Sequence, residues 1–427
     1  MRPEKFARLG DLCLKIGSGA TPRGGKESYK GGSTSLIRSQ NIHNDGFHLG
    51  GLVYIDDRQA AELRNVEVQP NDVLLNITGD SVARCCQVTA EVLPARVNQH
   101  VAIIRSNKSL IDPKFLRYVL VSSEYQSLLL TLASAGATRH ALTKSMVEDL
   151  EIPLFPLDAQ KKIGMFLGSI DDKILINQKM NGTLKAMAQA LFQSWFVDFD
   201  PVRAKLDGIK SIGLDDATAK LFPAAFQDSA LGHIPQGWEI RSLDKTADYL
   251  NGLALQKYPP SDGPTFPVIK IAQLRKGDVI GADRCNTELP QQYVVEDGDV
   301  LFSWSGSLEV DLWCGGTGAL NQHLFKVTSQ EFPKWFYYLW TLHHLDEFRL
   351  IAASKATTMG HIQRSHITDA KVVVPPRILL DAMTQTISPI IDQLIANKIQ
   401  SRTLALLRDT LLPKLLSGDL SVENLQP

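Results

Sequence analysis

Apolar side chains recur every seven residues in two stretches of the chain, residues 158–196 and 378–416. A seven-residue period sustained over four heptads is typical of a coiled-coil seam, and each stretch would form a helix about 58 Å long. Pro156 precedes the first helix, where a missing N–H does no harm, and Pro413 is expected to end or bend the second. The two seams are Ile163, Ile170, Asn177, Leu184 and Leu191, and Met383, Ile390, Asn397, Leu404 and Leu411, flanked by Phe166, Leu167, Ile174, Met187, Ile387, Leu394 and Leu407.

An asparagine occupies the same heptad position in each seam. A lone Asn among apolar seam residues lowers stability and fixes the register, because it is tolerated only opposite a polar partner. Asn177 and Asn397 lie near the middle of their helices, so antiparallel pairing would place them opposite each other across a pseudo-twofold axis. The alternative is two ordinary core helices, each with a tolerated polar residue.

Short apolar runs punctuated by Gly, Asn and Asp fill the rest of the chain, together with helical segments at residues 113–133 and 333–353. Such runs predict strands at residues 35–38, 73–77, 101–104, 268–271 and 372–374. The predicted fold class is therefore α+β, with two globular domains joined by a pair of long antiparallel coiled-coil helices in a pseudo-twofold duplication. The predicted boundaries are 1–156 for the first domain, 157–196 for its helix, 197–237 for a connector, 238–376 for the second domain, and 377–427 for the second helix and tail.

The duplication is visible in the sequence itself. Residues 134–145 match residues 354–365 at a shift of 220 positions, and Val97–Val101 match Leu320–Leu324 at a slightly larger shift. Asp72–Leu75 match Asp299–Phe302, and Ser18-Gly19 match Asn251-Gly252. The matches keep the same order along the chain, so they indicate a repeat with loops of different length.

The net charge of the chain does not indicate a nucleic-acid partner. The net charge is -1, residues 1–156 hold 18 basic and 16 acidic side chains, and residues 238–376 hold 13 and 16. Either a basic surface is local or partner subunits supply much of the phosphate contact. Five cysteines without a Cys-x-x-Cys spacing, no apolar start and no apolar run of membrane-spanning length predict a cytoplasmic protein without a zinc site and without a membrane partner.

Catalytic motifs are not found. Residues 19–26 resemble a phosphate loop superficially, but the glycine spacing fails and Glu27 stands where Ser or Thr is needed. No methyltransferase motif, Gly-rich cofactor fingerprint, hydrolase triad or metal constellation can be defended. The sequence predicts a binding protein with no catalytic residues, no metal and no cofactor.

Candidate DNA-binding residues fall into matched groups. Arg, Lys, Thr and His in a glycine-containing loop suit phosphates and base edges, and a polar loop capping a helix is the alternative. The Asn-Gln-His triplets offer amides suited to adenine, although their presence in both copies favours a structural turn. A basic stretch near the start has a counterpart in the second copy, and a solvated loop is the alternative there. The candidates are Thr138, Arg139, His140, Lys144, Lys355, Thr358, His361 and Arg364; Asn98, Gln99, His100, Asn321, Gln322 and His323; and Arg23, Lys26, Tyr29, Lys30, Arg38, Lys257, Lys270 and Gln273.

Several longer segments resemble a known family. Residues 170–181 and 190–203, Ser18–Pro22, His233–Ile240 and Leu407–Leu420 are similar to the conserved regions of type I restriction–modification specificity subunits. The resemblance implies two target-recognition domains that each read half of a split double-stranded DNA site. It also implies helices that separate the halves and dock two modification (methyltransferase) subunits, with restriction (translocase and nuclease) subunits bound through them.

One departure from the family pattern concerns Leu406 and Leu407, which replace an acidic and a polar residue in the second helix. We expect that face to be more buried than usual. Two other classes stay open on the residues alone: a self-contained DNA methyltransferase or nuclease, and a duplicated protein–protein scaffold that reads no DNA sequence.

Overall fold

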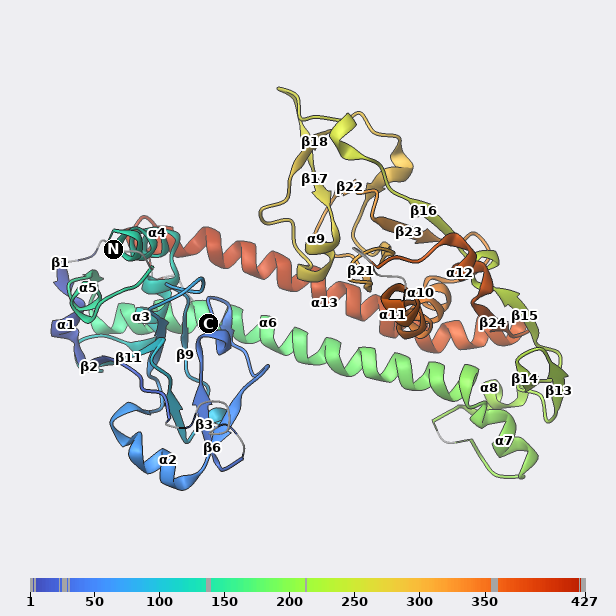
Figure 1. The fold of residues 1–427 in the computed structure, drawn as a ribbon, viewed down its shortest axis with the longest axis horizontal. Coiled ribbons are helices and arrows are strands. Elements are labelled where there is room, and N and C mark those ends of the chain that lie inside the picture. Colours follow the sequence, from blue (N-terminus) through green and yellow to red (C-terminus); the bar gives the residue numbers. More distant parts are fainter. Residues whose placement is uncertain are drawn as a thin grey trace. The chain divides into compact units, whose positions relative to one another are not determined.

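A computed structural model of the chain describes residues 3, 5–22, 24, 29, 31–135, 140–211, 213–354, 360–421 and 423. Close backbone contacts divide it into two compact units, residues 1–175 with 403–427, and residues 176–402. Each unit holds one globular domain and part of both long helices (Figure 1). Within the described residues, no helix is long and apolar enough to cross a membrane.

The two heptad segments form the long helices α6 (Leu157–Phe192) and α13 (Arg377–Ser417), and α6 continues into a π-helical turn at Gln193–Val197. In the second unit, Asn177 contacts Asn397 while Asn181 contacts Leu394, so residue numbers rise along one helix as they fall along the other. The pair is therefore antiparallel, as the sequence predicted.

The polar layer in the seam is real but offset. Asn177 is fully buried, and its amide nitrogen donates to the Gln400 side chain at 2.8 Å and to the Asn397 carbonyl at 3.4 Å. Asn397 donates instead to the side chain of Asn181 at 2.9 Å. The two asparagines therefore lie in one layer, but each amide finds a partner other than the opposing side chain.

The first domain is built from two four-stranded sheets and a two-stranded clasp. The sheet orders are β2-β11-β8-β9 and β6-β3-β10-β7, and the clasp pairs β1 with β12. Its strands are β1 (Lys5–Arg8), β2 (Cys13–Ser18), β3 (Thr34–Ile37), β4 (Ile42–His43), β5 (Gly46–Phe47), β6 (Val53–Ile55), β7 (Glu67–Val68), β8 (Val73–Asn76), β9 (Cys85–Gln87), β10 (Ala95–Val97), β11 (Val101–Ser106) and β12 (Glu151–Leu154). Its helices are α1 (Leu9–Leu12), α2 (Asp57–Glu62), α3 (Pro113–Val121), α4 (Ser123–Ser134) and α5 (Lys144–Glu148).

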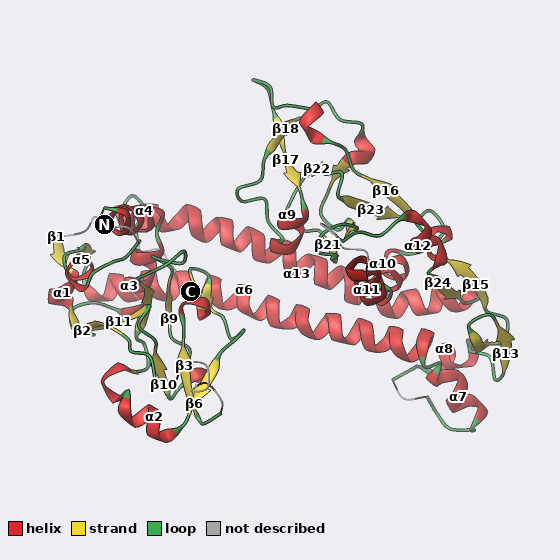
Figure 2. Ribbon diagram, in the orientation of Figure 1, coloured by secondary structure: helices red, strands yellow, loops and turns green. Residues whose placement is uncertain are grey.

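The second domain repeats the two four-stranded sheets and the clasp, but its described residues include no counterpart of the separate β4–β5 pair of the first domain. Figure 2 marks the strands of both domains in yellow. Its sheet orders are β16-β23-β20-β21 and β18-β17-β22-β19, and its clasp pairs β15 with β24. Its strands are β15 (Glu239–Ser242), β16 (Asp248–Asn251), β17 (Thr265–Ile269), β18 (Arg284–Asn286), β19 (Val294–Val295), β20 (Val300–Ser303), β21 (Val310–Leu312), β22 (Gly318–Leu320), β23 (Leu324–Thr328) and β24 (Lys371–Val374). Its helices are α9 (Ile271–Lys276), α10 (Lys334–His343), α11 (Leu345–Ser354) and α12 (Arg364–Asp369). The connector before it contains α7 (Asp200–Leu206), α8 (Asp216–Leu221), β13 (Phe226–Ser229) and β14 (Gly232–Pro235).

The alternation of side chains along the central strands explains why each domain has layers. On β8, Val73 and Leu75 pack into one core with Phe115 of α3, whereas Leu74 packs into a second core with Leu36 of β3. Successive strand residues point to opposite faces, so a strand that is apolar at every position must be covered on both sides. In the second domain Val300 and Leu301 divide between two cores in the same way.

Three expectations about the helices were wrong, and one of the two outcomes expected of Pro413 is excluded. Each helical segment of the domains is two helices, because the chain leaves the helix at Ser122, which caps α4, and again at His344. Pro413 does not end α13, which continues to Ser417. Leu412 before the proline and Leu415 and Leu416 after it are buried in the core of the first unit. That burial offsets the missing backbone hydrogen bond.

The exposed leucines are the second error and the flanking residue Met187 is the third, whereas the flanking residues Leu167, Ile387 and Leu394 are buried as predicted. Leu406 is 61% exposed and Leu407 44%, because the buried side of α13 here runs through Leu412 and Leu415 instead. Met187, expected to flank the seam of α6, is 48% exposed. The true buried seam is narrower than the apolar pattern suggested.

Candidate nucleic-acid interface

The Asn-Gln-His triplets form the same turn in both domains. The Asn98 side chain accepts a hydrogen bond from the His100 backbone N–H at 3.2 Å, and Asn321 accepts from His323 at 3.2 Å. Both asparagines are buried, at 8% and 4% exposure. Their side chains are therefore engaged in holding the turn, while Gln99 is exposed.

A hydroxyl group holds the histidine of each turn. Thr78 Oγ1 lies 2.6 Å from His100 Nδ1, and Ser305 Oγ lies 3.0 Å from His323 Nδ1. The sequence analysis did not single out these hydroxyls. Extending the match of Asp72–Leu75 with Asp299–Phe302 by three residues aligns Thr78 with Ser305, so the repeat contained the signal.

The loop that follows α4 or α11 reaches the same turn. Thr78 forms a β-bridge with Ala141, beside His140, and Ser305 forms one with His361. The backbone N–H of Gly79 donates to the His140 carbonyl at 3.3 Å, and that of Gly306 donates to Gly360 at 2.8 Å. The structure thus joins two of the predicted groups in each domain. Thr138, Arg139, Lys355 and Thr358 lie outside the described residues.

The basic residue after the parallel strand completes each cluster. The Asn98 N–H donates to the Ile37 carbonyl, directly before Arg38, and the Asn321 N–H donates to Ile269, directly before Lys270. The Arg38 guanidinium donates to the Gly51 carbonyl at 2.6 Å and lies 5.8 Å above the Tyr29 ring. Arg23, Lys26 and Lys30 fall outside the described residues.

Three of the four remaining candidates of the second domain have local hydrogen-bond or ion-pair partners. Lys270 pairs with Asp283, and the buried Gln273 side chain accepts from the Lys270 N–H at 3.3 Å to cap α9. Gln322 lies 3.4 Å from His323, and Lys257 is exposed. The Gln273 side chain is therefore buried as the cap of α9 and offers little surface to DNA.

A glycine makes the close approach beside each turn possible. A Cβ on Gly19 would lie 2.2 Å from the Val97 carbonyl oxygen, and a Cβ on Gly252 would lie 2.3 Å from that of Asn321. Any side chain here would push the strand away from the turn. This requirement explains why Ser18-Gly19 and Asn251-Gly252 match in the repeat.

The two clusters differ in the side chains that surround the shared turn. Position 77 is Ile and its counterpart is Trp304, whose indole N–H donates to Asn251 at 2.9 Å. Lys144 is exposed and pairs with Glu148, whereas Arg364 donates to the Tyr249 carbonyl and lies over Phe325. One framework therefore carries two different polar surfaces.

The family model of the type I restriction modification DNA specificity domain matches residues 2–186 and 235–407. The chain belongs to this family. It is therefore the DNA specificity subunit of a type I restriction–modification system, which is the non-catalytic subunit of that complex.

Two curated specificity subunits are similar to this chain over about three quarters of its length or more. The type I restriction enzyme MjaIX specificity subunit of Methanocaldococcus jannaschii is 24% identical over 426 residues, spanning 96% of this chain and 92% of the relative. The HindI specificity subunit of Haemophilus influenzae is 23% identical over 371 residues, spanning 76% and 81%. A crystal structure of the M. genitalium S subunit shares the fold, with a TM-score of 0.55 at 15% identity over 99% of this chain and 100% of that one.

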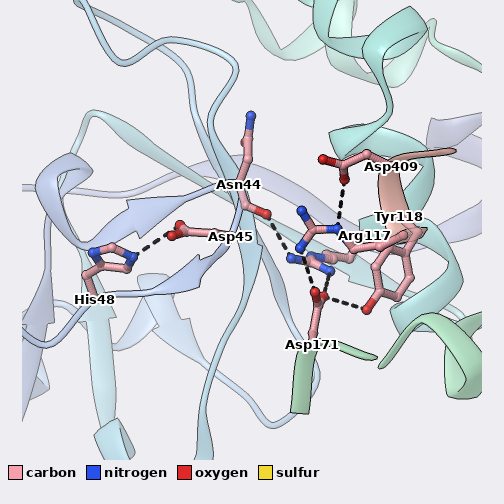
Figure 3. Close-up of polar contacts among 8 residues, drawn as sticks. Asn44, Asp45, His48, Arg117, Tyr118, Asp171 and Asp409 are labelled. Atoms are coloured by element: carbon pink, nitrogen blue, oxygen red, sulfur yellow. Dashed lines mark hydrogen bonds and ion pairs between the residues drawn. The ribbon is translucent and has the colours of Figure 1, made fainter. Parts of the chain in front are cut away.

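Ion pairs fasten each domain of the specificity subunit to the long helices. In the first unit Asp171 of α6 accepts hydrogen bonds from Arg117 of α3 at 2.5 Å, from Tyr118 at 2.6 Å and from Arg408 of α13 at 2.7 Å (Figure 3). In the second unit Arg402 of α13 forms a bidentate ion pair with Asp297. The hydrogen bond from Arg402 and the positive charge of its guanidinium lower the pKa of the Asp297 carboxyl. Buried charges need such pairing, so these contacts fix where each domain attaches.

Proposed function

We propose that the specificity subunit reads a bipartite double-stranded DNA site, with one half read by each target-recognition domain. We further propose that α6 and α13 set the gap and dock two modification subunits, which in turn bind the restriction subunits. The domain limits we propose are 1–156 and 238–376, with helices and tail at 157–196 and 377–427 and a connector at 197–237.

The observation that carries this proposal is one framework bearing two surfaces. Sheet order, the Asn-Gln-His turn and the hydroxyl–histidine contact repeat in both domains. The side chains around the turn differ, notably Ile77 against Trp304 and Lys144 against Arg364. Two readers of different base sequences need such differences, whereas their phosphate positioning and backbone can stay alike.

Exchange of a single domain tests the proposal. Residues 1–156 are replaced by those of a related specificity subunit, and the chimera is produced in cells with its modification partners. Sequencing of methylated positions should show one half-site changed and the other unchanged. A change in both halves, or a continuous site, would contradict two separate readers, and the absence of any sequence preference would favour a scaffold.

An exposed apolar stripe on α6 supports the docking role. Ile176, Met180 and Met187 of the second unit are 52%, 40% and 48% exposed, and their spacing places them on one face of the helix. Scattered exposed apolar residues are ordinary, but an aligned, Met-rich stripe is typical of a helix that binds another protein.

The stripe can be tested by capture of the modification subunit. Ile176→Glu in the stripe should weaken capture at least tenfold, because a carboxylate would be buried without a partner. Gln178→Glu, also exposed but off the stripe, introduces the same charge and should leave capture unchanged. Equal capture by both variants would remove the stripe from the interface.

A further inference from the structure

A short hairpin of the first domain gathers three side chains that can ligate a metal ion. His43 ends β4, Asp45 lies in the turn and His48 directly follows β5, and one donor atom from each lies within 4.8 Å of the other two. His48 Nε2 lies 3.1 Å from Asp45 Oδ1, and the His43 and His48 rings stack at 3.9 Å. These three residues are not among the candidate DNA-binding residues around the Asn-Gln-His turns.

From this arrangement we propose that His43, Asp45 and His48 form a binding site for a divalent transition-metal ion such as Zn²⁺. Imidazole nitrogen and carboxylate oxygen are ligands that Zn²⁺ takes at about 2.0–2.2 Å. The side chains of Asp45 and His48 are 60% and 47% exposed, so small side-chain rotations can close the donors around an ion and water can fill the remaining position.

The backbone of the hairpin is already fixed. His48 donates through its N–H to the Asn41 carbonyl at 2.8 Å, and the Asn41 side chain donates back to the His48 carbonyl at 2.9 Å. The Asn44 side chain accepts from the Cys85 N–H at 2.9 Å and donates to Gln126 at 2.9 Å. An ion would therefore need to order little besides the ligand side chains, which lowers the entropic cost of binding.

The site is linked to the ion pairs at the long helices, all within the first unit. Asn44 lies next to Asp45, and its carbonyl accepts a hydrogen bond from Arg117 at 2.8 Å (Figure 3). Arg117 in turn donates to Asp171 of α6, which also binds Arg408 of α13. An ion that fixes the Asn44-Asp45 turn would thus stabilise the attachment of the first domain to its helices.

Binding can be measured on the full chain with Co²⁺ as a spectroscopic probe and Zn²⁺ as competitor. The wild-type chain should bind one Co²⁺ at this site, with visible absorption that Zn²⁺ removes. His48→Ala and Asp45→Asn should each lower the affinity at least tenfold, since each removes a ligand. His233→Ala is the matched control, because His233 and Asp228 form an exposed pair at 3.0 Å to which the described residues add no third ligand.

Thermal unfolding provides the second readout. Zn²⁺ should raise the midpoint of the wild-type chain and of His233→Ala, but not that of His48→Ala or Asp45→Asn. Unfolding midpoints in chelator that equal the wild-type value would show that the variants fold. Asp45 has 60% of its side chain exposed, so Asp45→Asn still tests the proposal if His48→Ala fails to fold. Wild-type affinity in both ligand variants, or an equal loss in His233→Ala, would overturn the proposal.

Discussion

Asp171 holds a carboxylate in the interior of the first unit, where it accepts hydrogen bonds from Arg117, Tyr118 and Arg408. At the matching positions of the second copy, 220 residues away, stand Tyr337, Ile391 and Ala188, which belong to an apolar core. The two domains are thus attached by different chemistry. Removing one partner of a buried ion network leaves the other charges unpaired.

Asp171→Asn should therefore destabilise the first unit by about 3 kcal/mol near neutral pH. Hydrogen exchange of α3 amides during urea titration measures this loss. Asp172→Asn, at an exposed neighbouring position, serves as the control and should change stability by less than about 0.5 kcal/mol. A similar effect of both substitutions would assign the loss to the helix and not to the ion network.

The same residue predicts a pH dependence. Burial raises the pKa of Asp171, but Arg117, Arg408 and the Tyr118 hydroxyl outweigh it, and the net direction is downward. A carboxyl with a lowered folded-state pKa contributes its full stability above its usual pKa near 4, and loses it as the pH falls through the folded value. The difference between wild type and Asp171→Asn should therefore be constant from pH 7 to about pH 5 and shrink below pH 4. An undiminished difference at pH 3 would contradict it.

Lys144 permits a separate test of phosphate contact, because its side chain is exposed and forms a surface ion pair with Glu148. Lys144→Ala should weaken binding of all DNA sequences alike and reduce the salt dependence of the assembled complex by about one phosphate contact. Salt-titrated binding measures both quantities. A change confined to one half-site would instead make Lys144 a base reader.

At the scale of elements, the asparagine layer of α6 and α13 is unequal. Asn177 Oδ1 is buried and has no hydrogen-bond partner among the described residues, whereas the Asn397 amide donates to Asn181. An unpaired buried oxygen costs about 1–3 kcal/mol. Asn177→Leu should therefore raise the stability of the second unit by about 1 kcal/mol, and Asn397→Leu should not, because it removes a donor from Asn181. Urea unfolding of both variants decides, and equal effects would contradict the offset layer.

The elements also show what the sequence could predict. The heptad positions located both helices to within a few residues, and the repeat predicted two similar domains, because both signals are local or recur at fixed spacing. The Arg117–Asp171–Arg408 network was not predicted. Arg117 and Arg408 are 54 and 237 residues from Asp171 in the sequence, and the three follow no period. Leu406 and Leu407 misled because an apolar residue on a helix can face solvent as easily as a seam. The candidate site was found as three separate groups, and the parallel pairing of β3 with β10 and the bridge of Thr78 with Ala141 revealed that they meet.

At the scale of the whole molecule, helix length is the proposed ruler for the gap in the DNA site. Inserting four residues after Met180 lengthens α6 by about 6 Å, near two base-pair steps of ~3.4 Å each. We expect a longer gap with both half-sites unchanged, read by sequencing methylated positions. The same insertion after Gly208, in a turn of the connector, should leave the gap as it was. An unchanged gap in the first variant would mean that the helices are not the ruler.

The antiparallel pairing of α6 with α13 also has a consequence in time. The partner of α6 is made only after the second domain, and at about 5–20 residues per second its arrival takes on the order of ten seconds or more. Until then Ile163, Leu167 and Ile170, all buried in the finished unit, have no α13 beside them. The first domain can fold early, because α3 and its sheets precede α6, but the nascent chain carries an apolar helix face that must be protected from other chains. Slow completion of the specificity subunit would therefore favour its binding to a chaperone, or to a modification subunit, before synthesis ends.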